Sequence, residues 1–336
     1  MFKVLVPARI DLGGGISDIP EFASTGGTLI TNLAIDLFTD DEKTSKIEIA
    51  LRFDKSNRIE ILLNNQLIRS PINRVALTLI KELGITENFK VNIENKLPHS
   101  TGLGISSALN LALAAGFLKI KGRKKDLNLI KQAYRLEHEI MGVSGGFQDY
   151  ISAYFGGLNR IDFPDLAKIR EEKTLGIRLN PGVENYLNQN MIILVNRKNN
   201  QNSDQIVREE IQNFKKSPGM FKPYLEEIKN MNWQIYQLFQ YGSGNFYERL
   251  GNLINKSWFL HKKFSKKIVT GRIQLLEEKL RPLVFGLRGP GSGANSLFLL
   301  VNPKYKEKLF KLIKPLEDEF LICYAKVNRS GLLIKS

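Results

Sequence analysis

The segment from Leu97 to Ala108, with the sequence LPHSTGLGISSA, carries the clearest chemical signal in this chain. A predicted strand ends at its start, two glycines follow, and a predicted helix begins with Ser106 and Ser107. The first turn of a helix has unpaired N–H groups and the positive end of the dipole, so it binds anions well. Glycines let phosphates approach the backbone, and a serine hydroxyl can bind Mg²⁺. The alternative is a tight turn in which Ser106 only caps the helix.

An acidic pair lies farther along the chain. Asp149 follows two glycines, Gly145 and Gly146, and Glu137 stands twelve residues earlier on a predicted helix. An aspartate that takes a proton and a glutamate that binds Mg²⁺ are the acidic residues that phosphoryl transfer needs. Taken alone, an aspartate in such a position is more often an ordinary turn residue.

Two further glycine-rich segments could contribute to the same site. In residues 7–18, PARIDLGGGISD, Arg9 could neutralise developing charge and Asp18 could accept hydrogen bonds from sugar hydroxyls. The alternative is a surface salt bridge and a helix cap. The segment Gly289–Ala294, GPGSGA, fits the GxGxxA pattern of dinucleotide-binding folds only superficially, because a strand over 297–301 follows it. We interpret it as a loop that covers phosphates.

The hydrophobic pattern predicts the strands and helices that must position these segments. Strands are predicted over residues 3–6, 28–37, 46–53, 59–63, 90–94, 158–163, 191–195, 297–301 and 321–327. Helices are predicted over residues 74–83, 106–119, 126–141, 204–214, 221–241, 245–263, 266–280 and 304–314. Strands dominate early and helices later, so we expect an α+β fold. A domain boundary is expected near residues 164–190, since about 150 residues per domain predicts two domains.

The composition is that of an ordinary globular protein. Of its 336 residues, 43% are hydrophobic and 25% are charged, which excludes a disordered or collagen-like chain. No apolar stretch approaches the ~20 residues of a membrane span, and the first residues lack the features of a signal peptide. The single cysteine, Cys323, excludes an internal disulfide. We therefore expect a cytoplasmic protein with no membrane partner.

Charge is the one unusual bulk property. The net charge is +15, and residues 169–336 hold 28 Lys and Arg against 15 Asp and Glu. A nucleic-acid-binding surface would be one explanation. A solvated helix face is the better one, because no arginine-rich arm or nucleic-acid-binding module accompanies the charge, so we expect no nucleic acid partner. A third explanation is attraction of a multiply charged small substrate.

Together these motifs resemble the GHMP small-molecule kinase superfamily, and within it the bacterial D-glycero-D-manno-heptose 7-phosphate kinase and fucokinase-like branch. Residues 7–18 are similar to the first motif of its sugar kinases. Residues 98–108 are similar to the second, PxxxGLGxSSA, which is the most specific of the three. Residues 145–157 resemble the GG-x-QD segment of the branch and the A-x-x-GG that follows it. The resemblance covers nearly the whole chain.

The resemblance implies a role for each motif. It implies a two-domain fold, in which residues 1–180 resemble the second domain of ribosomal protein S5, residues 181–336 are ferredoxin-like, and ATP binds between them. Asp149 would be the catalytic base and Arg9 would lie near the γ-phosphate. Ser106 and Glu137 would bind Mg²⁺, with Glu139 a weaker candidate. The residues implied for ATP are Pro98, Gly102, Leu103, Gly104, Ile105, Ser106 and Ser107. Those implied for the sugar are Gly14, Asp18, Gly145, Gly146 and Gln148, and those of the third glycine loop are Gly289, Gly291, Ser292 and Gly293. Arg288, beside that loop, is the candidate that the positive charge of the second half suggests for contact with a phosphorylated sugar.

The third motif departs from the family pattern, which usually reads GAGGGG. Here Pro290 removes an N–H group, while Ser292 and Ala294 restrict the backbone. The polar loop over residues 196–203 also replaces a more conventional segment of the branch.

The resemblance implies an ATP-dependent kinase that phosphorylates the anomeric hydroxyl of a sugar. The first expectation for the substrate is D-glycero-D-manno-heptose 7-phosphate, converted to the 1,7-bisphosphate for surface polysaccharide synthesis. Fucose or another hexose is the nearest alternative. A catalytically silent sugar- or nucleotide-binding protein and an RNA-binding protein are alternatives of other classes. The presence of Arg9, Ser106, Glu137 and Asp149 together argues against a silent binder. We expect a monomer or homodimer.

Overall fold

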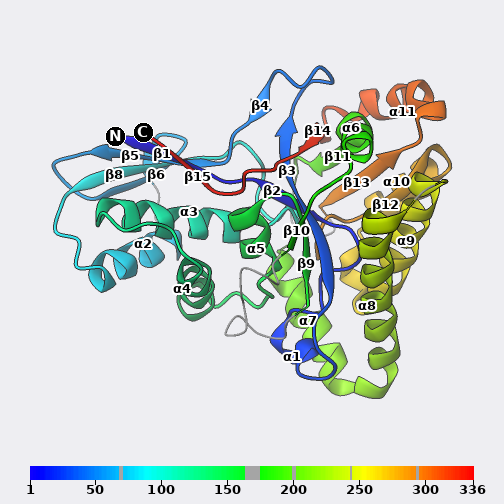
Figure 1. Cartoon of the computed structure of the whole chain (residues 1–336), viewed down its shortest axis with the longest axis horizontal. Helices are drawn as coiled ribbons and strands as arrows, with labels where there is room; N and C mark the ends of the chain where they lie inside the picture. The colour runs from blue at the N-terminus through cyan, green and yellow to red at the C-terminus, as the bar shows by residue number, and fades with distance from the viewer. Residues whose placement is uncertain (68–70, 163–174, 199–201, 243, 293–294) are drawn as a thin grey trace.

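The computed structural model of the chain describes residues 1–67, 71–162, 175–198, 202–242, 244–292 and 295–336 (Figure 1). Its strands are β1 (Phe2–Leu5), β2 (Ala8–Asp11), β3 (Ile30–Phe38), β4 (Lys46–Ile47), β5 (Ala50–Lys55), β6 (Glu60–Leu63), β7 (Gln66–Leu67), β8 (Phe89–Glu94), β9 (Leu158–Ile161), β10 (Leu175–Ile177), β11 (Met191–Asn196), β12 (Val284–Arg288), β13 (Ser296–Val301), β14 (Phe320–Val327) and β15 (Leu333–Lys335). Its α-helices are α1 (Pro20–Ala23), α2 (Pro71–Glu82), α3 (Ile105–Ile120), α4 (Asn128–Leu136), α5 (Gln148–Phe155), α6 (Pro181–Asn190), α7 (Ser203–Lys216), α8 (Pro218–Tyr241), α9 (Phe246–His261), α10 (Gly271–Leu280) and α11 (Lys306–Ile313). The predicted α+β class is confirmed.

The first sheet has six strands in the order β15-β1-β5-β8-β6-β7, and helices α2, α3 and α4 lie on one side of it (Figure 1). Residues Ala108–Leu118 of α3 are buried without interruption, as expected for a helix enclosed on all sides. α3 lies so close to β5 at Gly116 that a β-carbon there would overlap the ring of Phe53. This packing holds α3 close against the sheet.

The second sheet has nine strands, and its path runs β10-β9-β3-β14-β11-β13-β12, with β2 and β4 each pairing with β3. β3 is buried at every position except Asp36, as expected for a strand that is covered on both faces. β2 pairs with β3 in the register Ala8↔Ile35 to Asp11↔Asn32. This pairing holds Arg9 on the strand that leads into the first glycine-rich segment.

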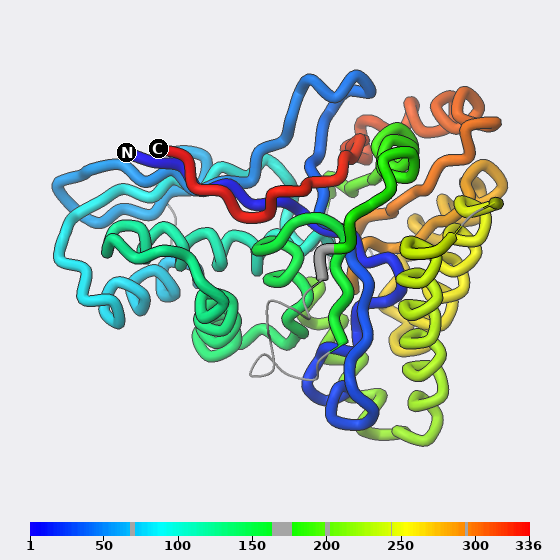
Figure 2. Tube along the Cα trace, in the orientation of Figure 1, coloured from blue at the N-terminus to red at the C-terminus, as the bar shows by residue number. Residues whose placement is uncertain are grey.

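Strands from the end of the chain return to its beginning. β14 pairs with β3, and β15 pairs with β1 in the register Lys3↔Lys335, so the two termini lie side by side (Figure 2). Residues 1–180 and 181–336 therefore share one sheet through the β3–β14 pair. The division into domains of residues 1–180 and 181–336 stays a prediction, and residues 163–174 of the expected boundary region lie outside the described residues.

The long helices of the second half cover β12 and β13 (Figure 1). α9 approaches β12 at Gly251, where a β-carbon would overlap the backbone of Phe285. One apolar core extends from the first sheet and α2 to α5 into the second sheet and parts of α8 and α9. A second lies among α7 to α11 and strands β11 to β13. Within the described residues, no helix is both long and apolar enough to cross a membrane.

Most predicted elements exist, but several differ in extent. The predicted strand over 46–53 is two strands, β4 and β5, and the predicted helix over 266–280 begins only at Gly271. The predicted helix over 126–141 is α4 followed by a π-helical turn, Glu137–Met141, which ends at Gly142 as expected. The final residue of the predicted strand over 158–163 lies outside the described residues. The elements that were not predicted are α1, α5, α6, β2, β7, β10, β12 and β15.

Candidate active site

The loop before α3 has the geometry of an anion-binding turn. Ser100, Gly102 and Gly104 adopt left-handed φ angles of 53°, 72° and 71°. Gly104 precedes α3 and no side chain caps the helix, so the alternative in which Ser106 is the cap is wrong. A β-carbon at Gly104 would lie 3.1 Å from side-chain atoms of both Arg9 and Asp149, a tight contact, and the left-handed φ also favours glycine there. Residues 102–107 all line one cleft.

The buried carboxylate of Glu137 faces the serines of this loop. It is 1% exposed, and it accepts hydrogen bonds from Ser106 Oγ at 2.6 Å and Ser107 Oγ at 2.8 Å. Burial raises the pKa of Glu137, while the two serine hydrogen bonds oppose the rise. Glu139, in contrast, is 58% exposed and pairs with Arg135 at the surface. The structure thus brings Ser106 and Glu137 together and leaves Glu139 outside.

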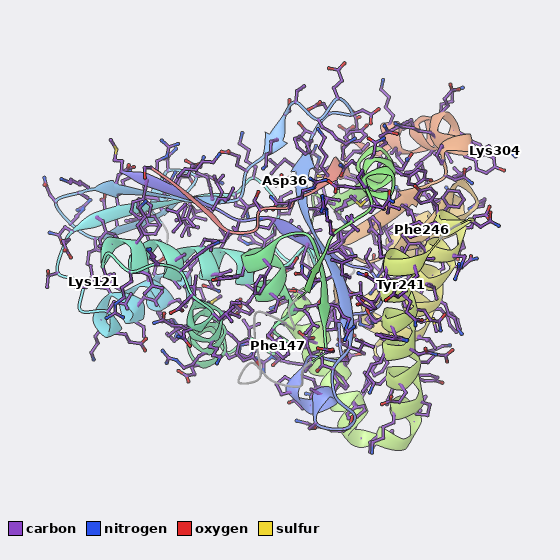
Figure 3. All side chains as sticks on the ribbon, viewed as in Figure 1. Asp36, Lys121, Phe147, Tyr241, Phe246 and Lys304 are labelled. Atoms are coloured by element: carbon purple, nitrogen blue, oxygen red, sulfur yellow. The ribbon has the colours of Figure 1, made fainter. Side chains whose placement is uncertain are left out.

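Asp149 lies in the first turn of α5, directly after Phe147 and Gln148, and Phe147 is labelled in Figure 3. Its Oδ1 accepts a hydrogen bond from Arg9 Nε at 2.6 Å. Arg9 Nη1 also donates to the carbonyl oxygens of Gly102 and Pro290, the latter at 2.6 Å. One buried guanidinium therefore joins the catalytic aspartate predicted from sequence to the second and third glycine-rich loops.

The third glycine loop contacts the first glycine-rich segment through a backbone carbonyl group. Pro290 O accepts hydrogen bonds from Arg9 and from the backbone N–H of Asp11 at 3.0 Å. A β-carbon at Gly291 would overlap the carbonyl oxygen of Gly102, so the two loops touch there. Ser292 lines the cleft, whereas Gly293 lies outside the described residues. The N–H group that proline lacks is not needed for these contacts, which explains how the loop tolerates Pro290.

The GG-x-QD segment meets the first glycine-rich segment at Asp18. Asp18 is completely buried, and its Oδ2 accepts a hydrogen bond from the backbone N–H of Gln148 at 2.7 Å. Gln148 Nε2 donates to Gly15 O at 2.6 Å, and a β-carbon at Gly146 would overlap the Asp18 carboxylate. Asp18 Oδ1 has no partner within the described residues. Burial raises the pKa of Asp18 to about 7.

Asp18 lies behind the cleft wall, which Gly145, Gly146 and Gln148 form. The expectation that it contacts a sugar therefore stays a prediction. Its unpartnered Oδ1 is the feature that supports this prediction, because a buried acceptor without a donor is costly.

The structure places Gly14 and Arg288 outside the lining of the cleft. Gly14 N–H donates to Asp11 Oδ1 at 2.8 Å and Gly14 O accepts from Asn232, so both backbone groups are occupied. Arg288 is fully buried and pairs with Asp11 Oδ2 at 3.1 Å and with Ser257 Oγ at 3.2 Å. Burial lowers the pKa of Arg288, although Asp11 opposes the change. Arg288 supports the first glycine-rich segment through Asp11, and the expectation that Gly14 or Arg288 contacts a sugar stays a prediction.

The cleft has a volume of about 290 Å³ and adjoins a second cavity of about 580 Å³. The cavity shares His99, Ser100, Ile105 and Ser106 with the cleft. Its other walls are mainly apolar and consist of Leu63, Leu67, Pro71, Ile72, Ile93, Pro98, Leu109 and Met141, with Asn95 and Asn110. A polar cleft beside a mainly apolar cavity suits a ligand with a charged end and a flat apolar end.

Several residues of the site were not found from the sequence. Asn232 of α8 is fully buried, accepts from Thr31 N–H at 2.6 Å and donates to Gly14 O at 3.1 Å. The start of α7 closes another side of the cleft, where Asp204 accepts from Ser144 N–H at 2.6 Å. A buried asparagine on the apolar face of a helix was a signal for Asn232, but no local pattern indicated Asp204.

Comparison with known proteins places these features in context. Residues 70–157 match the family model described as the GHMP kinases N-terminal domain. The chain is 24% identical over 343 aligned positions to the bifunctional fucokinase/GDP-fucose pyrophosphorylase of Arabidopsis thaliana, with 94% of this chain and 31% of that protein covered. It therefore spans about a third of the length of that relative.

A second relative is matched along nearly its full length. The chain is 21% identical to the D-glycero-alpha-D-manno-heptose 7-phosphate kinase of Campylobacter jejuni, with 93% of both chains covered. Among solved structures, a D-glycero-D-manno-heptose 1-phosphate kinase from Bacteroides thetaiotaomicron is similar with a TM-score of 0.74 and 18% identity, over 100% of this chain and 99% of that one. At this identity the structural likeness concerns the fold alone.

Proposed function

We propose that this chain, which belongs to the GHMP kinase superfamily of ATP-dependent kinases, transfers the γ-phosphoryl group of ATP to the anomeric hydroxyl of a sugar. The observation that carries the proposal is the convergence of four side chains on one cleft at the start of α3. These are Arg9, Ser106, Glu137 and Asp149. A protein that only bound a sugar or a nucleotide would not need an aspartate beside a phosphate-binding loop.

In this proposal ATP occupies the cleft and the adjoining cavity. Its phosphates lie against residues 102–107, where the N-terminus of α3 favours anions. The adenine lies in the mainly apolar cavity, which opens to the cleft past Ile105 and Ser106. The left-handed glycines allow the close backbone approach that phosphate binding needs.

The donor set fits Mg²⁺. Ser106 Oγ and Glu137 Oε1, 2.6 Å apart, are hard oxygen donors of the kind that Mg²⁺ prefers. Mg²⁺ commonly takes only one or two protein ligands and completes its shell with nucleotide phosphates and water. When bound there, the ion would neutralise charge on the phosphates during transfer.

Asp149 and Arg9 have separate roles in the proposed phosphoryl transfer. Asp149 Oδ1 is held by Arg9, and no hydrogen bond engages Oδ2 within the described residues. Oδ2 can therefore accept the proton of the attacking hydroxyl. Arg9 keeps its guanidinium between this carboxylate and the loop carbonyl groups, where it opposes the negative charge of the phosphates.

The acceptor that we propose first is D-glycero-D-manno-heptose 7-phosphate. It is the substrate named for the Campylobacter relative, and the positive charge of the second half favours an anionic substrate. One observation favours a neutral sugar instead. Among the described residues that line the cleft, only Arg9, His99 and His138 can carry positive charge, while Ile19 and Val207 add apolar surface. The plant relative is named as a fucokinase.

ADP release across a panel of sugars tests both candidates. The panel contains heptose 7-phosphate, unphosphorylated heptose, fucose and mannose, each measured at low and high ionic strength. We expect the highest kcat/KM for heptose 7-phosphate, with an advantage that narrows as salt screens the charge. A preference for a neutral sugar would select the second candidate, and no ADP release with any sugar would contradict the proposed activity.

A further inference from the structure

Tyr150 lies beside the proposed metal ligand, although no motif indicated it. It follows Asp149 in the first turn of α5 and is completely buried. Its hydroxyl donates a hydrogen bond to Glu137 Oε2. The ring of Tyr134 packs edge-on against the ring of Tyr150, with 5.8 Å between the centroids and 77° between the planes. The phenol is therefore held in place by burial and by a second aromatic ring.

The donors to Glu137 are distributed unequally between its two oxygens. Oε2 accepts from Ser107 Oγ at 2.8 Å and from Tyr150, whereas Oε1 accepts from Ser106 Oγ at 2.6 Å. A carboxylate can accept at two positions on each oxygen, so Oε2 is filled and Oε1 keeps one position. The partner on Oε1 is also the serine proposed to bind Mg²⁺. Oε1 is thus the oxygen able to face a metal ion.

We propose that Tyr150 is a positioning residue for the metal site, an inference that rests on the proposed function of Glu137. Its hydroxyl holds Oε2, which turns Oε1 toward Ser106 and the nucleotide phosphates. The same hydrogen bond stabilises the charged carboxylate in a buried position, where an unpartnered charge would be costly. Residues that orient a metal ligand in this way typically contribute about 10–100-fold to metal affinity.

The position of Tyr150 also links the metal site to the catalytic base. Asp149 and Tyr150 are neighbours in one turn of α5, and they reach two different groups, Arg9 and Glu137. One turn of α5 therefore carries both the proposed base and a hydrogen-bond donor to the proposed metal ligand.

The test is Tyr150→Phe, which removes one hydroxyl and keeps the ring. Mn²⁺ binding in the presence of a non-hydrolysable ATP analogue, followed by electron paramagnetic resonance, reports the metal site without turnover. We expect Mn²⁺ affinity to fall by about 10–100-fold. Tyr154→Phe is the matched control, because it removes a hydroxyl one turn farther along α5, where the ring faces Lys125. It should leave Mn²⁺ affinity unchanged.

A double-mutant cycle with Glu137→Gln separates positioning from a general structural effect. If Tyr150 acts through the carboxylate, Tyr150→Phe has no further effect on Mn²⁺ binding once Glu137 is replaced. An equal loss in both backgrounds overturns the proposal, as does wild-type affinity in Tyr150→Phe when Glu137→Gln abolishes binding. If neither single variant weakens Mn²⁺ binding, the assignment of Glu137 itself is wrong and this inference falls with it. Should Tyr150→Phe fold poorly, Tyr150→Met, which also lacks the hydroxyl and keeps an apolar side chain, replaces it with the same expected outcomes.

Discussion

Replacing Asp149 by Asn removes one negative charge from the cleft and almost no volume. The amide oxygen can still accept the hydrogen bond from Arg9 Nε, and Arg9 keeps its bonds to the carbonyl groups of Gly102 and Pro290. An amide cannot take a proton from an attacking hydroxyl, and general base catalysis is typically worth about 10²–10⁴-fold. We therefore expect kcat to fall by about 100-fold or more, which corresponds to ~2.7 kcal/mol of activation free energy.

The same substitution should spare folding and nucleotide binding. A hydrogen bond between a charged pair contributes more than one with a neutral acceptor, so the free energy of unfolding should fall by about 1 kcal/mol. Removing a negative charge beside the phosphate loop should leave ATP affinity equal to that of the wild type or higher. A loss of turnover without a loss of ATP binding is the result that identifies a base rather than a binding residue.

The assay measures ADP release with the best sugar of the panel, together with ATP binding by calorimetry. Asp36→Asn is a matched control, because the side chain of Asp36 is 22% exposed and pairs with Lys46 at 2.8 Å, whereas that of Asp149 is 21% exposed and pairs with Arg9. Figure 3 labels Asp36 and Phe147, the residue two positions before Asp149, in well-separated parts of the molecule. Turnover of Asp149→Asn within fivefold of the Asp36→Asn control would refute the assignment of the base.

Three further predictions concern the metal, the buried acid and the helix contact. Ser106→Ala and Glu137→Gln should each raise the Mg²⁺ concentration for half-maximal activity, whereas Glu139→Gln should not, and equal Mg²⁺ titrations of all three would contradict the metal site. The pKa of Asp18 is raised from its ordinary value of 3.8 to about 7 in the folded state. Between these two pH values the folded state binds more protons than the unfolded state, so the free energy of unfolding falls as pH rises from about 4 to about 7. Asp18→Asn should therefore gain stability relative to the wild type between pH 5 and 8 in thermal denaturation, and parallel curves would refute this. Asn232→Leu leaves two buried backbone groups unpaired, so urea denaturation should show a loss of about 2–5 kcal/mol, and a loss below 1 kcal/mol would contradict the contact.

The glycine loop and the acid pair could be predicted because their signals are local. Two glycines and two serines at the start of an apolar helix define an anion-binding turn within a few residues. The structure places Ser106 against Glu137, as the choice of residue types suggested. The end at Gly142 of the helical segment formed by α4 and its π-helical turn was likewise predictable, because glycine readily adopts the left-handed conformation that ends a helix.

Burial and long-range partners could not be predicted. Arg288 was expected near the substrate because it precedes a glycine loop, yet Asp11 and Ser257 enclose it from distant parts of the chain. β2 was missed because four residues between Pro7 and a glycine run do not show a strand pattern, and β3 supplies the partner that makes it one. Such contacts depend on which surfaces tertiary packing brings together, and a local sequence pattern does not predict them.

The contacts of Arg9 have a consequence for the synthesis of the chain. One guanidinium requires Gly102, Asp149 and Pro290 at the same time, and these residues leave the ribosome far apart. A nascent chain that has reached only residue 160 already carries the phosphate loop and the aspartate, but Arg9 lacks its last acceptor. The contacts of Arg9 are therefore completed only after residue 290 has been made.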